Sequence, residues 1–364
     1  MGLPRSAYVK DGQEGVFHCF SRCVRRAFLC GFDPVTHRDF SHRKTLLLDR
    51  LRHLAAIFAI DVCAYAIMAN HFHLILRTRP DMVASWSDLE VATRCLTLFP
   101  HYNRKEDKFE PPSDMQISAL ANDPKRIAEL RKRLSSLSWF MGRLNEFIAR
   151  AANKEDNVKG RFWESRFKCI ALLDDAAIAA CMAYVDLNPI RAGQAATPEE
   201  SDFTSIQERI RAWHPEMLVQ NSVSIEDIQK PAETSCMSGP VPSRTIDSSD
   251  PSTPWLCPIQ SDTHRRGILQ ITSADYFDLV DRSGRLLKSG KRGAIDADLA
   301  PVLLRIGLKP DAWLDTISRF ESRFRLAAGL LSSLRNFSDQ LGRRWLTGLT
   351  AAQAVFVTSA QQSV

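Results

Sequence analysis

The 364-residue chain lacks a stretch long and apolar enough to cross a membrane, and it lacks paired cysteine motifs. A membrane-spanning helix needs about 20 apolar residues, and no uncharged apolar run approaches that length. The first ten residues hold no signal-peptide core, so we expect a cytoplasmic protein with no membrane partner. The nine cysteines are scattered without a Cys-x-x-Cys pair, which argues against a zinc knuckle and fits reduced thiols.

A large net charge is also lacking, since the formal value is only +6, so the distribution of charge matters more than its sum. Residues 124–168 hold twelve Lys or Arg against five Asp or Glu. Such a segment is either a contact surface for a polyanion or a solvated helix face, and both interpretations stay open on charge alone.

Length and composition predict two domains. Residues 1–215 carry the motifs described below. Residues 216–260 include a run rich in Pro, Ser and Thr, which is typical of a linker. Residues 261–364 are predicted to form a mainly helical C-terminal domain, and no catalytic motif assigns it a role.

Within the first domain, periodicity predicts an α+β fold with the order strand, helix, strand, strand, helix, strand, helix. The first strand is expected near residues 16–24, a helix follows Ser41, and residues 61–77 form a β-hairpin that turns at Ala69-Asn70. Residues from about 80 to 157 are a helical insertion whose last helix is expected over about 123–152. A strand near 169–173 and a helix that ends near Pro189 complete the order.

His71 and His73 stand two residues apart in the second strand of the hairpin. Successive side chains of a strand alternate between faces, so both imidazoles point the same way and could reach one divalent ion. The alternative is a pair of histidines on a half-exposed strand without a metal.

Arginine and lysine alternate with aromatic residues in the segment at 160–168. This mixture suits phosphate contacts and base stacking on a single strand of nucleic acid. The candidate DNA-binding residues there are Arg161, Trp163, Arg166 and Lys168.

Tyr184 and Asn188 are four residues apart in the last predicted helix and therefore lie on one face of it. Taken singly, Tyr184 could be a helix tyrosine packed under the sheet and Asn188 an ordinary helix C-terminal residue. Their convergence with the two histidines favours a functional site.

Three segments together resemble one family: the hairpin at 65–76 with His71-Phe72-His73, the block at 160–168, and the run at 184–193 with Tyr184 and Asn188-Pro-Ile-Arg-Ala-Gly. They are similar to the single-tyrosine transposases of the HUH nuclease superfamily, which include REP-associated tyrosine transposases. The resemblance covers about residues 10–210 and implies a ferredoxin-like βαββαβα core.

By the same resemblance, Tyr184 corresponds to the nucleophile, and His71, His73 and Asn188 correspond to ligands of Mg²⁺ or Mn²⁺. Arg191, in the same motif, joins the candidate DNA contacts. The implied activity is metal-dependent nicking and strand transfer of single-stranded or hairpin DNA through a 5′-phosphotyrosine, by a monomer or homodimer. A phenol with a pKa near 10 needs help to attack a phosphate at neutral pH.

Two other functions remain as alternatives. One is a DNA-hairpin-binding regulator that derives from a mobile element and no longer cleaves. The other is a zinc hydrolase, which would need a third histidine or carboxylate and a general base near the two histidines.

Overall fold

A computed structural model describes residues 3–24, 29–33, 37–213, 255–288 and 300–357. Most of the linker predicted at 216–260 therefore lies outside the described residues. None of the helices in the described part of the chain combines the length and the apolar character needed to span a bilayer.

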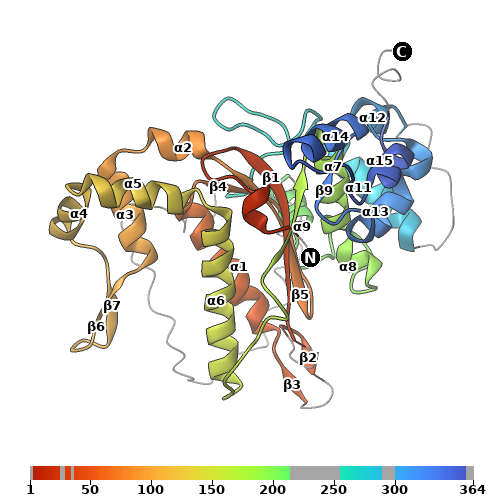
Figure 1. Cartoon of the computed structure of the whole chain (residues 1–364). Coiled ribbons are helices and arrows are strands. Elements are labelled where there is room, and N and C mark those ends of the chain that lie inside the picture. Colours follow the sequence, from red (N-terminus) through yellow and green to blue (C-terminus); the bar gives the residue numbers. More distant parts are fainter. Residues whose placement is uncertain (1–2, 25–28, 34–36, 214–254, 289–299, 358–364) are drawn as a thin grey trace.

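A five-stranded mixed sheet forms the centre of the molecule, which confirms the predicted α+β class (Figure 1). Its strand order is β4-β5-β1-β8-β9. The first four are antiparallel neighbours, whereas β9 runs parallel to β8. The strands are β1 (Gly15–Arg22), β4 (Ile60–Ile67), β5 (His71–Thr78), β8 (Lys168–Leu172) and β9 (Ala327–Ala328).

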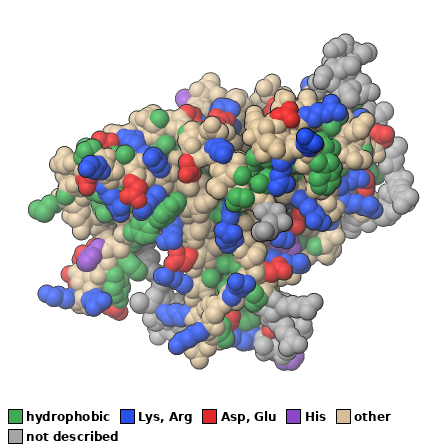
Figure 2. All heavy atoms as spheres, in the orientation of Figure 1, with side chains coloured by type: hydrophobic (Ala, Val, Ile, Leu, Met, Phe, Trp, Pro, Cys, Tyr) green, Lys and Arg blue, Asp and Glu red, His purple; other side chains and the backbone are tan. Residues whose placement is uncertain are grey.

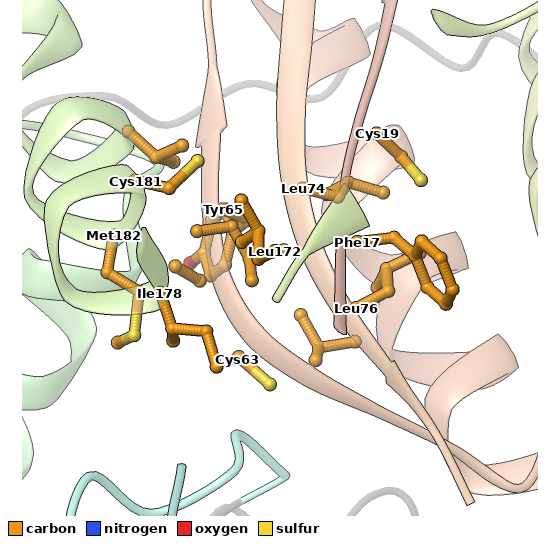
Figure 3. Packing of buried hydrophobic residues seen from close by; sticks show 14 of the residues in the cluster. Phe17, Cys19, Cys63, Tyr65, Leu74, Leu76, Leu172, Ile178, Cys181 and Met182 are labelled. Atoms are coloured by element: carbon orange, nitrogen blue, oxygen red, sulfur yellow. The ribbon is translucent and has the colours of Figure 1, made fainter. Parts of the chain in front are cut away.

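Helices cover both faces of this sheet (Figure 1). On one face lie α1 (His42–Ile57) and α6 (Leu137–Glu155), and α7 (Asp175–Asp186) lies on the other. Apolar side chains fill the core on both sides of the sheet: Figure 3 shows Met182 of α7 on one side of the strands and Leu74 and Leu76, beside Phe17, on the other. The alternation along β5 puts Phe72, Leu74 and Leu76 on the face opposite the histidines, and Phe72 packs there on Trp163.

The predicted insertion is helical with one small hairpin, and it extends away from the sheet (Figure 1). Its last helix was predicted to be continuous and is instead divided into α5 (Pro124–Leu134) and α6 at Ser135 and Ser136. Ser136 has extended backbone angles, and the Leu134 carbonyl at the end of α5 accepts a hydrogen bond from the Ala59 amide at 2.8 Å. The elements are α2 (Pro80–Ser85), α3 (Asp88–Leu98), β6 (His101–Asn103), β7 (Lys108–Glu110), α4 (Asp114–Ala121) and α5 (Pro124–Leu134).

The C-terminal part packs directly against α7 and the sheet. Besides β9, its elements are α11 (Ser273–Lys288), α12 (Ala300–Arg305), α13 (Pro310–Arg323), α14 (Leu331–Gln340) and α15 (Leu349–Val355). The shorter elements elsewhere are η1 (Arg5–Ala7), β2 (Phe32–Asp33), β3 (Arg38–Asp39), α8 (Asn188–Arg191) and α9 (Ser205–Trp213).

Asp186, the last residue of α7, holds three helices together. Its buried carboxylate accepts hydrogen bonds of 2.6 Å from Ser205 in α9 and from Tyr276 in α11. A buried charge is tolerated when hydrogen bonds replace its water. The end of the helix that carries Tyr184 is therefore fixed against the C-terminal part.

Candidate catalytic and nucleic-acid site

His71 and His73 lie on one face of β5, as predicted, and their rings meet edge to face with centroids 4.9 Å apart. His73 is 1% exposed, whereas His71 is only partly buried. The Asn70 side-chain oxygen lies 2.6 Å from His71 Nδ1 and orients that ring.

His18 of β1 is a third histidine on this face, and the sequence interpretation gave it no role. Its Nε2 lies 2.9 Å from Nδ1 of His73. With the proton on His73 Nδ1, this hydrogen bond leaves a lone pair on His73 Nε2, the arrangement found in histidines that bind metals. The alternation of side chains along β1 could have predicted the face on which His18 lies. Its contact with His73 could not be predicted in this way, because it depends on the pairing of β1 with β5.

Burial keeps all three imidazoles neutral near pH 7. Loss of water lowers the pKa of His18 to about 3 and that of His71 to about 4, and it moves the pKa of His73 well below its ordinary value. A neutral imidazole is the form that coordinates a cation.

Tyr184 reaches the same place from α7. Its ring lies edge-on to His73, with centroids 5.6 Å apart, and edge-on to His18 at 5.9 Å. Its hydroxyl donates a hydrogen bond of 3.2 Å to Oε2 of Glu321 in α13, and the Arg191 guanidinium lies 4.7 Å from the ring centroid. Burial, followed by the charge of Glu321, raises the pKa of Tyr184 to about 12.

Asn188 is buried just beyond α7, which ends at Asp186. Leu187 interrupts the helix that was predicted to be continuous, and Asn188 begins α8, where Pro189 follows it. Within the described residues, the side-chain nitrogen of Asn188 has no hydrogen-bond partner. The nitrogen and oxygen of an amide are told apart by their partners, so this buried end of the side chain, which has none within the described residues, can be either atom and can serve as a ligand.

The donor set fits a divalent cation in its chemistry. His73 Nε2 is buried without a hydrogen-bond partner within the described residues, and the same is true of the Asn188 amide nitrogen. In the described part of the chain, no group of three or more His, Cys, Asp or Glu side chains is arranged to hold a metal. A site here would therefore depend on the Asn188 amide as its third ligand.

A cleft of about 1230 Å³ opens beside Tyr184, between the sheet and the C-terminal helices. We call it the basic cleft, because its charged lining residues are mostly Arg or Lys. These are Arg5, Arg166, Lys168, Arg191, Arg319, Arg325 and Arg343, and Glu321 is the one acid among the described lining residues. A side pocket of about 110 Å³ adjoins it at His71 and shares Arg166, Lys168 and Glu321.

Three of the predicted DNA-binding residues, Arg166, Lys168 and Arg191, thus lie in one cleft with the predicted nucleophile. Arg161 is exposed but does not line that cleft. Trp163 was expected to stack on a base, and its position contradicts this, because it is 8% exposed and its indole nitrogen donates a 2.8 Å hydrogen bond to the Asn145 carbonyl.

Trp163 should act as a core residue. Trp163→Ala removes a ring that packs on Phe72 and Phe162, and we expect the free energy of unfolding to fall by about 3–5 kcal/mol in urea titrations. The same change at Trp345, which is 69% exposed, should alter stability by less than about 0.5 kcal/mol. Equal stability losses in the two variants would contradict this placement.

Much of the positive charge of the insertion is paired within the molecule. Glu129 pairs with Arg126 and Arg133, and Glu146 pairs with Arg143 and Arg150. Other Lys and Arg side chains are spread over the face seen in Figure 2. For the paired arginines, the solvated helix face is the better interpretation.

Comparison with protein-family models finds no match, and no curated protein matches the chain significantly. Among solved structures, a REP-associated tyrosine transposase bound to a REP hairpin is similar, with 11% sequence identity and a TM-score of 0.32. The match covers 65% of this chain and 96% of that one. A TM-score this low does not establish a shared fold, so the function proposed for this chain rests on its own residues and contacts.

Proposed function

We propose that this chain is a metal-dependent transposase that nicks single-stranded DNA near hairpins and transfers strands through a 5′-phosphotyrosine on Tyr184. The observation that carries the proposal is the position of Tyr184. It lies against His73 on one side and lines the basic cleft on the other. In this proposal, the nucleophile and the candidate ligand His73 therefore lie beside a surface that suits a polyanion.

In this proposal, His71, His73 and Asn188 hold Mg²⁺ or Mn²⁺. When bound, such an ion polarises the scissile phosphate and neutralises charge that develops on it. His18 orients His73 through their hydrogen bond. Arg191 donates a 2.5 Å hydrogen bond to the Ser318 carbonyl, and its guanidinium lies beside the Tyr184 ring. Its buried Nη1 has no partner within the described residues and can donate to a phosphate oxygen.

The basic cleft would hold the unpaired strand. Its exposed cations suit phosphates, and the exposed ring of Trp345 on the cleft wall suits a base. Trp345 thereby takes the stacking role first expected of Trp163. The order of β4, β5, β1 and β8, with α1 between β1 and β4, α6 before β8 and α7 after it, supports a ferredoxin-like core as part of the proposal.

The test is incubation with hairpin-flanked oligonucleotides and Mg²⁺ or Mn²⁺, followed by a denaturing gel. A label at the 3′ end of the oligonucleotide should become attached to the protein, and a label at the 5′ end should leave with a free 3′-hydroxyl. DNA binding without any covalent band would instead support a non-cleaving regulator.

Asn188→Ala should retain the nucleophile but weaken the response to metal. We expect the Mn²⁺ concentration for half-maximal adduct formation to rise by about tenfold or more, with activity partly recovered at high Mn²⁺. Gln194→Ala, at an exposed residue just after α8, is the control and should behave as the parent. An unchanged Mn²⁺ requirement in Asn188→Ala would remove this residue from the ligand set.

A further inference from the structure

Glu321 comes from α13 in the C-terminal part, far in sequence from the other residues of the candidate site. Its carboxylate accepts the hydrogen bond from the Tyr184 hydroxyl at 3.2 Å. It also lines both the basic cleft and the side pocket next to His71. No other described carboxylate forms a hydrogen bond with that hydroxyl.

Glu321 has a negative charge, whereas the other charged residues that line the basic cleft are positive. An acid in a surface that binds phosphates repels the ligand and lowers its affinity. A carboxylate is expected in such a surface only where its chemical role offsets the repulsion. A carboxylate that accepts the hydrogen bond of the attacking hydroxyl can have such a role, because it can take the proton during the attack.

We infer that Glu321 is a catalytic residue that takes the proton from Tyr184 as the phenol oxygen attacks phosphorus. The inference rests on the proposed function, because it names the base for that reaction. It assigns the C-terminal part a role in the active site.

The step is balanced without a further reactant. The O–H bond of Tyr184 breaks, its proton moves to Oε2 of Glu321, and the freed electron pair forms the bond between oxygen and phosphorus. The bond from phosphorus to the 3′ oxygen breaks, and that oxygen leaves with its electron pair. It takes a proton from solvent while Glu321 releases one, and re-ligation by a 3′-hydroxyl is the reverse.

Packing holds Glu321 in place for this role. The neighbouring Phe320 is buried, with its ring centroid 5.9 Å from that of Tyr184. Ser318, one turn earlier, accepts the hydrogen bond from Arg191. A base fixed by its neighbours is already close to the geometry that proton transfer needs.

The experiment compares adduct formation by the full-length parent, Glu321→Gln and Asp311→Asn, with a saturating hairpin-flanked oligonucleotide and Mn²⁺. Glutamine keeps the size of the side chain and cannot accept the proton, so the single-turnover rate should fall by about 10²-fold or more. Affinity for the oligonucleotide should stay equal or rise. Asp311 lies in the first turn of the same helix, is exposed and lines neither cleft, so Asp311→Asn should react as the parent does.

A second variant separates chemistry from packing. Glu321→Ala should be as slow as Glu321→Gln, and added formate should restore part of its rate, which a structural role would not predict. The inference is overturned if Glu321→Gln reacts within threefold of the parent, if it reacts faster, or if formate has no effect on Glu321→Ala. If the parent itself forms no Tyr184-dependent adduct, the proposed function fails first and the role of Glu321 fails with it.

Discussion

Tyr184→Phe should form no covalent adduct and no nick with any hairpin-flanked oligonucleotide, while it still binds that DNA. The change removes one oxygen and leaves the ring, so its contacts with His73, His18 and Phe320 survive. The lost hydrogen bond to Glu321 should cost about 1 kcal/mol of stability. The adduct signal should fall to the detection limit, because in the proposed reaction Tyr184 supplies the oxygen of the covalent bond to DNA.

The measurement is a denaturing gel with 3′-labelled oligonucleotide, accompanied by fluorescence anisotropy for binding. Tyr65→Phe is the matched control. Tyr65 is buried on β4 and donates a 2.7 Å hydrogen bond to Glu208, so its loss should affect stability and leave the adduct. An adduct at the parental rate in Tyr184→Phe would place the nucleophile elsewhere, with Tyr65 and Tyr102 the next residues to test.

The hairpin and the two faces of its second strand could be predicted because they depend on local chemistry. Residues 71–77 alternate between polar and apolar side chains except at Ile75, and Ala69-Asn70 suits a tight turn. Once such a hairpin forms, His71 and His73 must share a face. The α+β class followed from the same kind of periodicity, applied element by element.

The parts of the site that could not be predicted depend on contacts between distant segments. The bond from His18 to His73 joins residues 55 positions apart, and that from Tyr184 to Glu321 joins residues 137 apart. A two-residue strand such as β9 has no periodicity to detect, yet its pairing with β8 brings the C-terminal part to the edge of the sheet. Sequence spacing within one element contains no information of this kind.

Trp163 shows how composition can mislead. A tryptophan between arginines has the chemistry of a stacking platform, but the hydrogen bond to the Asn145 carbonyl and the adjacent aromatic rings place it in the core. Large aromatic side chains contribute most when their area is buried, so burial is the usual outcome even within a basic segment. Trp345 has a comparable arginine neighbourhood and is exposed, because it lies in a loop that follows α14.

Three arginines of the basic cleft should account for much of the affinity for single-stranded DNA. Arg166, Arg325 and Arg343 are exposed, line the cleft, and form no ion pair with any described residue, so each is available to a phosphate. Binding to a single strand weakens with salt by a power of about 0.7 for each phosphate contact. The triple Arg→Gln variant should therefore lose affinity by on the order of 100-fold near 0.1 M salt, and its logarithmic salt slope should fall by about 2.

The matched control carries the same loss of three charges on the insertion, at Arg104, Arg126 and Arg150, which are exposed and do not line the cleft. It should retain most of its affinity for a short unpaired oligonucleotide, measured by anisotropy across a salt series. Equal losses of affinity in the two variants would mean that the DNA is attracted by the overall charge and has no defined binding site. A large loss in the control alone would place the strand on the insertion, away from Tyr184, and so contradict the basic cleft as its binding site.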